Sequence, residues 1–340
     1  MTTNAENALV CQLLCASNAA YGIAFTHSVR FTELQPYFDK TGFATDDPPT
    51  LFVAGKDGIH GGLVGTLSDP TQPGAADSVV VAFRGTHPPD LSGIPDVASF
   101  LEDWANNFEA KPIRVAEVPG HVHAGFWEGV DTLWSAPFID EVRRRLAAST
   151  AKRLYVTGHS KGGAMAHLAG MRLISELGIM PAAVVSFAGA RPGTQDFAGA
   201  YKAQPLTIRR YEYGDDIVPH FPPSDFFLTH LKEALQRFEA MQPEPFSLFP
   251  EPFMQHLDTI RRLVEALDKI PAHHYASVGE LHYLTPFGDA VGDSTKLRLR
   301  RAISLARLLA LGRFKTIGFQ HAINCGSGYL DEVCPEEVCG

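Results

Sequence analysis

A serine flanked by glycines lies in the segment VTGHSKGGAMAH, residues 156–167. Ser160 has Gly158 two positions before it and Gly162 two positions after it. A strand-like apolar run precedes this pattern and a helix-like run follows it, as in a nucleophile elbow. Glycines leave room for a strained turn, and the start of the helix favours negative charge near the hydroxyl. The segment therefore predicts a nucleophilic serine, with a plain strand–turn–helix as the alternative.

A serine hydroxyl needs a base, and the base needs an orienting acid. In elbows of this kind the acid and then the histidine follow the serine along the chain. Asp215 and Asp216 both follow the strand-like run 207–213, at the end of a strand where such a site is built. The residues alone leave the base open among the downstream histidines, which are His220, His230, His256, His273, His274, His282 and His321.

A sheet must position these groups. Near-continuous apolar runs predict strands covered on both faces at 50–55, 78–85, 153–158, 182–189 and 207–213. Helical patterns at 137–148 and 162–177 separate the later strands, and the second is apolar almost all round. Strands that alternate with helices predict an α/β fold with a mostly parallel, doubly wound central sheet.

The pattern becomes helical after Pro219. Residues 228–241 and 257–270 place apolar side chains three and four positions apart. We expect residues 222–272 to form a helical insertion, which acts either as a lid or cap, together with residues 87–101, or as an additional packed layer or dimer contact. A further amphipathic helix is expected at 295–311, with a basic polar face.

The composition limits the partners and the compartment. A net charge of -9 on 340 residues argues against a nucleic-acid partner. The apolar run 8–25 lacks a basic leader, so we expect it to be the first helix of a cytoplasmic protein, with export by a signal-less route as the alternative.

The cysteines are expected to be reduced thiols, and they are Cys11, Cys15, Cys325, Cys334 and Cys339. A Cys334–Cys339 disulfide is an alternative without geometric support. A zinc site made by the last three cysteines would need a fourth ligand, so we expect no metal.

Motifs spread along the chain resemble those of the class 3 (fungal-type) lipases, a family of α/β hydrolases. The matching segments, in the family's order, are SNAAY (17–21), VVVAFRGT (79–86), EDWANNF (102–108), VHAGF (122–126), GHSKGGAMAHLAG (158–170), FAGARPG (187–193) and GDDIVPHFPP (214–223). The resemblance covers the chain apart from residues 222–272. It implies a single α/β-hydrolase domain over residues 1–340.

The resemblance implies a catalytic triad. Ser160 would be the nucleophile. Asp216 would be the acid, because it directly precedes Ile-Val-Pro, which selects it over Asp215. His321 would be the base, with Tyr329 further along than the family's usual aromatic residue.

The resemblance also implies an oxyanion hole. Its donors would be the backbone N–H of Lys161 and a group of Thr86, either its backbone N–H alone or its backbone N–H together with its hydroxyl. Arg84 would tie down the loop that carries Thr86. The Lys161 ammonium would pair with an acid of the wall, or alternatively attract an anionic substrate.

These roles predict a serine ester hydrolase, a lipase or carboxylesterase that cleaves acylglycerol-type esters through an acyl-enzyme without a cofactor. The nearer alternative is a phospholipase or acyltransferase on the same triad. The more distant alternative is a lipase-like protein that binds its ligand without catalysing a reaction. The expected partner is a lipid or other ester, with transient contact to a lipid interface, and the oligomeric state is left open.

Overall fold

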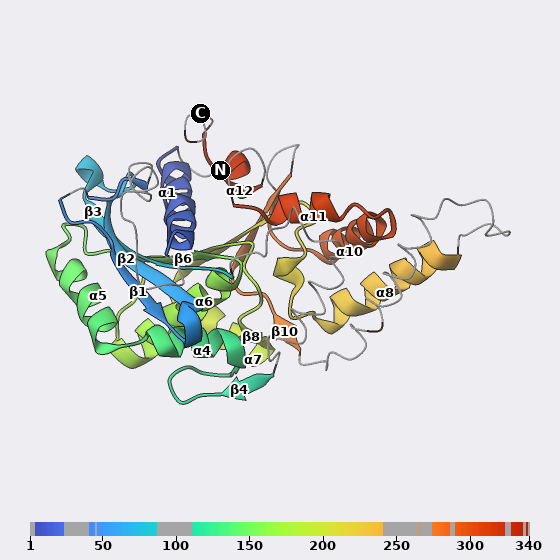
Figure 1. Cartoon of the computed structure of the whole chain (residues 1–340), viewed down its shortest axis with the longest axis horizontal. Coiled ribbons are helices and arrows are strands. Elements are labelled where there is room, and N and C mark those ends of the chain that lie inside the picture. The colour runs from blue at the N-terminus through green and yellow to red at the C-terminus, as the bar shows by residue number, and fades with distance from the viewer. Residues whose placement is uncertain are drawn as a thin grey trace.

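The computed structural model describes residues 4–23, 41–44, 46–86, 111–240, 265, 274–285, 290–323, 328–335 and 338. Within these ranges the chain forms a central sheet with helices on both faces and a small second sheet (Figure 1). The run 87–101 and most of the second half of the predicted insertion lie outside the described residues.

The central sheet has the strand order β1-β2-β3-β6-β7-β9-β11-β12. The strands are β1 (Thr50–Ala54), β2 (His60–Ser68), β3 (Asp77–Phe83), β6 (Leu154–His159), β7 (Ala183–Phe187), β9 (Thr207–Tyr213), β11 (Glu280–Leu284) and β12 (Ala290–Val291). The strands from β3 to β11 run parallel, whereas β1, β2 and β12 pair antiparallel with their neighbours. The predicted mostly parallel sheet is therefore confirmed.

Helices cover both faces of this sheet. Helix α1 (Asn4–Tyr21) lies on one face, and α4 (Ala124–Leu133), α5 (Ala136–Ala148) and α6 (Lys161–Leu177) lie on the other (Figure 1). Successive residues of a strand point to opposite faces. In β3, Val80 and Ala82 accordingly pack in the cluster around α1, whereas Val79 and Val81 pack in the cluster around α6. The doubly wound arrangement follows from this alternation.

A second sheet and the C-terminal helices complete the described fold. The second sheet has the order β10-β8-β5-β4, formed by β4 (Pro112–Arg114), β5 (His121–His123), β8 (Gly193–Thr194) and β10 (Tyr275–Ala276). The other helices are α7 (Gln195–Lys202), α8 (Asp225–Ala240), α10 (Thr295–Ala310), α11 (Phe314–His321) and α12 (Tyr329–Val333), with short 3-10 turns η1 (Lys56–Gly58), η2 (Pro73–Ala75) and η4 (Val218–His220). Helix α8 packs against α10, so the first part of the predicted insertion is helical. Among the described helices, none has the length and apolar composition of a membrane span.

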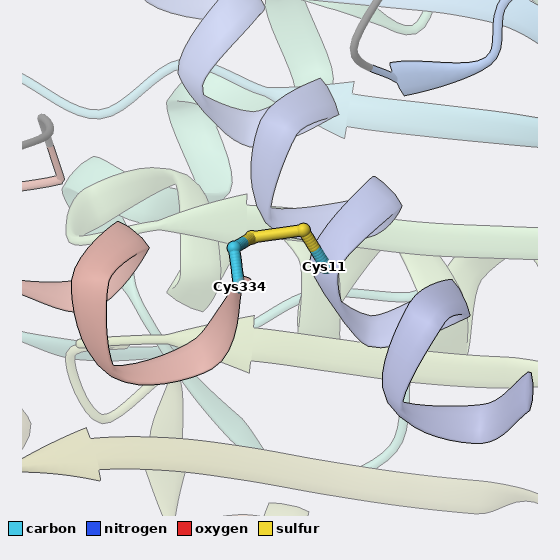
Figure 2. Close-up of a disulfide and its surroundings, with 2 residues drawn as sticks. All are labelled: Cys11 and Cys334. Carbon is cyan, nitrogen blue, oxygen red and sulfur yellow. A yellow bond between two sulfur atoms is a disulfide. The ribbon is translucent and has the colours of Figure 1, made fainter. Parts of the chain in front are cut away.

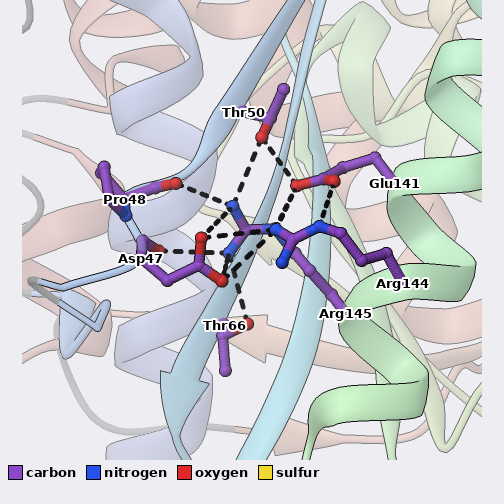
Figure 3. A network of polar contacts seen from close by, with 7 residues as sticks. All are labelled: Asp47, Pro48, Thr50, Thr66, Glu141, Arg144 and Arg145. Carbon is purple, nitrogen blue, oxygen red and sulfur yellow. Dashed lines mark hydrogen bonds and ion pairs between the residues drawn. The ribbon is translucent and has the colours of Figure 1, made fainter.

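A buried arginine ties α5 to the sheet. The Arg145 side chain is 1% exposed and forms an ion pair with Glu141 at 2.6 Å. It also donates to the backbone oxygen of Pro48 at 2.7 Å and to the Thr50 hydroxyl at 3.3 Å (Figure 3). Hydrogen bonds, first from Arg144, lower the pKa of Glu141 to about 2, with burial opposing them.

A disulfide corrects the expectation of reduced cysteines. Cys11 of α1 is bonded to Cys334, just after α12, across 323 positions of sequence (Figure 2). The Cys334–Cys339 alternative is wrong, because Cys334 already has this partner. Spacing along the chain does not reveal such a pairing, since only the packing of α1 beside α12 brings the two sulfurs together. Cys325 and Cys339 lie outside the described residues.

Candidate active site

The glycine-flanked serine lies on a sharp turn between β6 and α6. Ser160 has φ 61° and ψ -128°, a conformation that few residues with a Cβ adopt. A Cβ on Gly158 would lie 2.1 Å from the Gly162 carbonyl oxygen, and a Cβ on Gly162 would lie 2.1 Å from the Phe83 oxygen. Both glycines are therefore required by close backbone contacts, and the turn has the geometry of a nucleophile elbow.

Ser160, His321 and Asp216 form one hydrogen-bonded chain. His321 Nε2 lies 3.0 Å from Ser160 Oγ. His321 Nδ1 lies 3.0 and 3.1 Å from the two carboxylate oxygens of Asp216. A carboxylate accepts, so Nδ1 carries the proton and Nε2 is left to accept from the serine hydroxyl. The three groups come from the end of β6, the turn after β9 and the end of α11.

Two further donors hold the Asp216 carboxylate. The Tyr329 hydroxyl donates to Oδ2 at 2.8 Å, and the Val218 backbone N–H donates to Oδ1 at 3.0 Å. Asp216 and Tyr329 are both fully buried. Burial, together with the Asp216 charge, raises the pKa of Tyr329 well above its ordinary value. The phenol therefore stays protonated and can donate to the carboxylate.

A second imidazole fixes the backbone of His321. His159, directly before the serine, has Nε2 at 2.9 Å from the His321 backbone oxygen. That contact requires Nε2 to donate, so Nδ1 accepts from the Tyr21 hydroxyl at 2.8 Å. Burial, and then the proximity of His321, lowers the pKa of His159 well below its ordinary value. A neutral His159 matches this pattern of one donor and one acceptor.

Two residues are predicted to form the oxyanion hole. Lys161 directly follows Ser160 in the chain, and Thr86 lies just after β3, the strand that pairs with β6. Lys161 is the first residue of α6, so its backbone N–H has no acceptor within the helix. Thr86 is exposed and ends the described part of its segment, so its oxyanion role stays a prediction. Arg84 is 1% exposed and donates to the carbonyl oxygens of Ile23 and Gly58, which confirms that it ties down this segment.

The Lys161 side chain differs from both sequence-based expectations. It is 7% exposed, so it is not presented at the surface to an anionic substrate. Its Nζ donates to His60 Nδ1 at 2.9 Å, and it forms no ion pair with an acid among the residues that the structure describes. Burial, and then the Arg84 charge, lowers the pKa of Lys161 to about 8, whereas Glu128 acts in the opposite direction. No sequence pattern indicates His60, which lies 101 positions away on β2.

The remaining candidates have other positions. Asp215 accepts from the Ser304 hydroxyl at 2.9 Å and forms no contact with His321 among the described interactions. His220 lies in η4, where it stacks on Phe227. His282 is a buried residue of β11 and stacks on Tyr211.

Sequence reasoning missed Tyr21 and His159 as supports of the site. Both belong to quoted motifs, SNAAY and GHSKGG, so their motifs were found but not their contacts. Tyr329 was noted only as an aromatic residue after the histidine. The available indication was the polar atom that each of these aromatic rings carries, because hydroxyl and imidazole groups within a fold are normally hydrogen-bonded.

Comparisons with known proteins find similarity to lipases. The sequence model of the family described as lipase (class 3) matches residues 80–226. A lipase of Rhizopus niveus is 31% identical over 156 residues, which are 45% of this chain and 37% of that protein. A secreted mono- and diacylglycerol lipase of Fusarium solani is 30% identical over 131 residues, 38% of each chain. The chain thus matches well under half the length of these relatives.

A solved structure shares the fold. The native Rhizomucor miehei lipase propeptide complex superimposes with a TM-score of 0.54 at 18% identity, covering 87% of this chain and 73% of that one. At this identity the likeness shows an α/β-hydrolase fold and nothing about activity. The family match covers the elbow and the acid, and the fold agrees, so residues 80–226 of this chain are similar to the class 3 lipases.

Proposed function

We propose that this protein is a serine ester hydrolase that cleaves acylglycerol-type esters through an acyl-enzyme on Ser160. The observation that carries the proposal is the chain of hydrogen bonds from Ser160 Oγ through His321 to Asp216. A hydroxyl, an imidazole and a carboxylate in this order are the groups that acyl transfer requires. The names of the Rhizopus and Fusarium relatives support a lipid ester as the substrate.

In the acylation step, His321 Nε2 takes the proton of Ser160 while Oγ bonds to the ester carbonyl carbon. The oxyanion that forms accepts from the backbone N–H of Lys161 and from Thr86, our proposed second donor. The tetrahedral intermediate then collapses, its bond to the leaving oxygen breaks, and His321 returns the proton to the departing alcohol.

In the deacylation step, His321 takes a proton from water, and the hydroxide attacks the acyl-enzyme. The fatty acid leaves as Ser160 regains its proton. Asp216 keeps Nδ1 protonated and stabilises the imidazolium that exists in both steps. Tyr329 and His159 position the acid and the base. Residues 222–272, as a lid over the acyl site, remain a prediction of the sequence.

A substrate panel tests the proposal. Wild-type protein and Ser160→Ala are assayed with p-nitrophenyl esters of increasing chain length, a triglyceride emulsion, a monoacylglycerol and a phospholipid. We expect ester hydrolysis by the wild type and a loss of about 10³-fold or more in the variant. Preference for the phospholipid would favour the phospholipase alternative. Transfer to an added alcohol would favour an acyltransferase, and no turnover of any ester would favour a binding protein.

The compartment is also a proposal. Disulfides persist in oxidising compartments and are rare in the cytosol. The Cys11–Cys334 bond therefore favours an oxidising compartment over the cytoplasmic location that the sequence predicts. Peptide mapping of the protein from its native source without reductant tests this, since a fully reduced pair would support the cytoplasm.

A further inference from the structure

A cavity of about 580 Å³ lies between the second sheet, the end of the central sheet and the C-terminal helices. Its lining comes from β9, the segment 274–281, the start of α8 and the start of α10. None of the Ser160, His321 and Asp216 side chains lines it. Its volume lies within the range of small-molecule sites in proteins. The proposed ester hydrolysis gives this cavity no role.

A buried arginine without an acidic partner lines this cavity. Arg191, in the loop between β7 and β8, is 7% exposed. Its Nη1 donates to the Pro222 backbone oxygen at 2.9 Å, and its Nε donates to the Ser277 hydroxyl at 3.4 Å. Among the described residues, it forms no ion pair and Nη2 has no acceptor. A buried cation without a carboxylate is uncommon, because removing its charge from water is costly.

Two acids of the lining are already shared by other arginines. Glu212 is 3% exposed and accepts from both Arg210 and Arg301. Asp293 accepts from Arg210 at 2.7 Å and from Arg298 at 2.8 Å. Four arginines of the lining therefore face two acids that are both occupied.

The other two acids of the lining are more exposed and lie beside histidines. Asp225 is 2.9 Å from His274, and Glu280 is 3.7 Å from His282. The inner part of the cavity thus carries more positive than negative charge. Burial lowers the pKa of Arg191 to about 9; the Glu212 charge opposes this effect, and the charges of the other arginines add to it. An anion bound beside Arg191 would neutralise part of this positive charge.

We propose that this cavity is a binding site for a small molecule bearing a phosphate or carboxylate group, held by the guanidinium of Arg191. A guanidinium presents paired N–H groups that match the oxygens of either anion. Phe227 and Tyr275 provide ring surface in the lining for an organic remainder. The Arg191 backbone N–H also donates to the Phe221 backbone oxygen, in the segment that follows Asp216.

Calorimetric titration tests the site without any turnover, so its result is independent of the proposed hydrolase. Inorganic phosphate, glycerol 3-phosphate and hexanoate are titrated at constant ionic strength into the wild type, Arg191→Gln, Ala276→Phe and Arg143→Gln. Ala276 lines the cavity, and a phenyl ring there fills it without removing the arginine. Arg143 is an exposed arginine on α5 and serves as the matched control.

We expect at least one probe to bind the wild type with a Kd of about 1 mM or tighter. Binding should weaken about tenfold or more in Arg191→Gln and Ala276→Phe, and should stay within about twofold in Arg143→Gln. The preferred probe then distinguishes a free phosphate, a phosphorylated organic molecule and a carboxylate.

Absence of binding by every probe would overturn the proposal. An affinity for the probe that is unchanged in Ala276→Phe would also overturn the proposal. If Arg191→Gln fails to fold, the Ala276→Phe result alone tests the site.

Discussion

Tyr329 supports the proposed catalytic acid through its 2.8 Å hydrogen bond to Asp216. A hydrogen bond to a charged group contributes about 1.5–3 kcal/mol. We predict that Tyr329→Phe lowers kcat roughly tenfold and leaves KM within about twofold, because the phenol orients the triad and does not touch substrate. Steady-state kinetics with a soluble p-nitrophenyl ester measure both constants.

A neighbouring tyrosine provides the control. The Tyr283 hydroxyl donates to the Gly214 backbone oxygen at 3.1 Å and not to Asp216. Tyr283→Phe should therefore keep its kcat within about twofold of the wild type. Equal losses of kcat in the two variants would contradict a positioning role for Tyr329.

Because of Lys161, the free energy of unfolding is expected to depend on pH in the alkaline range. Its pKa falls from an ordinary 10.5 to about 8 in the folded protein. Between these values the unfolded chain holds a proton that the folded chain lacks, so the free energy of unfolding rises with pH. We predict that Lys161→Met removes about 1–3 kcal/mol of this rise between pH 8 and pH 10.

Urea unfolding at several pH values, compared between wild type and variant, measures the difference. Lys202 is an exposed lysine on α7, and Lys202→Met should retain the wild-type slope. A Lys161→Met curve parallel to the wild type across this range would show that the side chain titrates normally.

At the scale of elements, Arg145 holds α5 against the first strands of the sheet. Removing it takes one of several donors from Glu141 and removes the guanidinium that donates to the backbone oxygens of Asp47 and Pro48 (Figure 3). Breaking a buried ion pair by deleting one partner costs about 3–5 kcal/mol. We predict a loss of that size in the free energy of unfolding of Arg145→Met at pH 7, measured with urea.

The matched control lies on the same helix. Arg143 is exposed, so Arg143→Gln should change the free energy of unfolding by less than about 0.5 kcal/mol. A comparable loss in both variants would mean that helix charge, and not the buried network, stabilises α5.

The elements that the sequence predicted well are those with the strongest apolar patterns. The parallel strands β3, β6, β7 and β9 were predicted because residues buried on both faces form near-continuous apolar runs. Strand β2 was missed, since HGGLVGTLS contains three glycines and no clear alternation. The two- and three-residue strands of the second sheet carry no local pattern, because only pairing with distant segments makes them strands.

The same limit applies to the candidate site. Ser160, Asp216 and His321 were found from the order of motifs, and the structure brings their side chains together. The Tyr21–His159 and Lys161–His60 contacts join residues more than 100 positions apart, which no spacing rule connects. Side chains that support a site therefore emerge only from the packed fold.

At the scale of the whole molecule, the Cys11–Cys334 disulfide joins the first described helix to the last (Figure 2). A bond that closes a loop of this length restricts the unfolded chain strongly and stabilises the fold by about 3–5 kcal/mol. We predict that Cys334→Ser lowers the free energy of unfolding by that amount without changing kcat more than about twofold, since neither cysteine contacts a triad residue among the described interactions.

Thermal unfolding with and without reductant measures this effect. Reductant should lower the Tm of the wild type and leave that of Cys334→Ser unchanged. Cys15→Ala controls for the loss of a neighbouring thiol and should remain sensitive to reductant. A wild-type Tm that does not respond to reductant would argue against the bond.

The most direct test of the account is a covalent one. A fluorophosphonate reacts with a serine only when a neighbouring base activates it, so intact-mass spectrometry and peptide mapping report on the proposed triad itself. We predict a single adduct on the peptide that carries Ser160, no adduct in Ser160→Ala, and labelling at least about 10³-fold slower in His321→Ala. An unmodified Ser160 in folded wild-type protein, or equally fast labelling without His321, would contradict the claim that these residues form an active site.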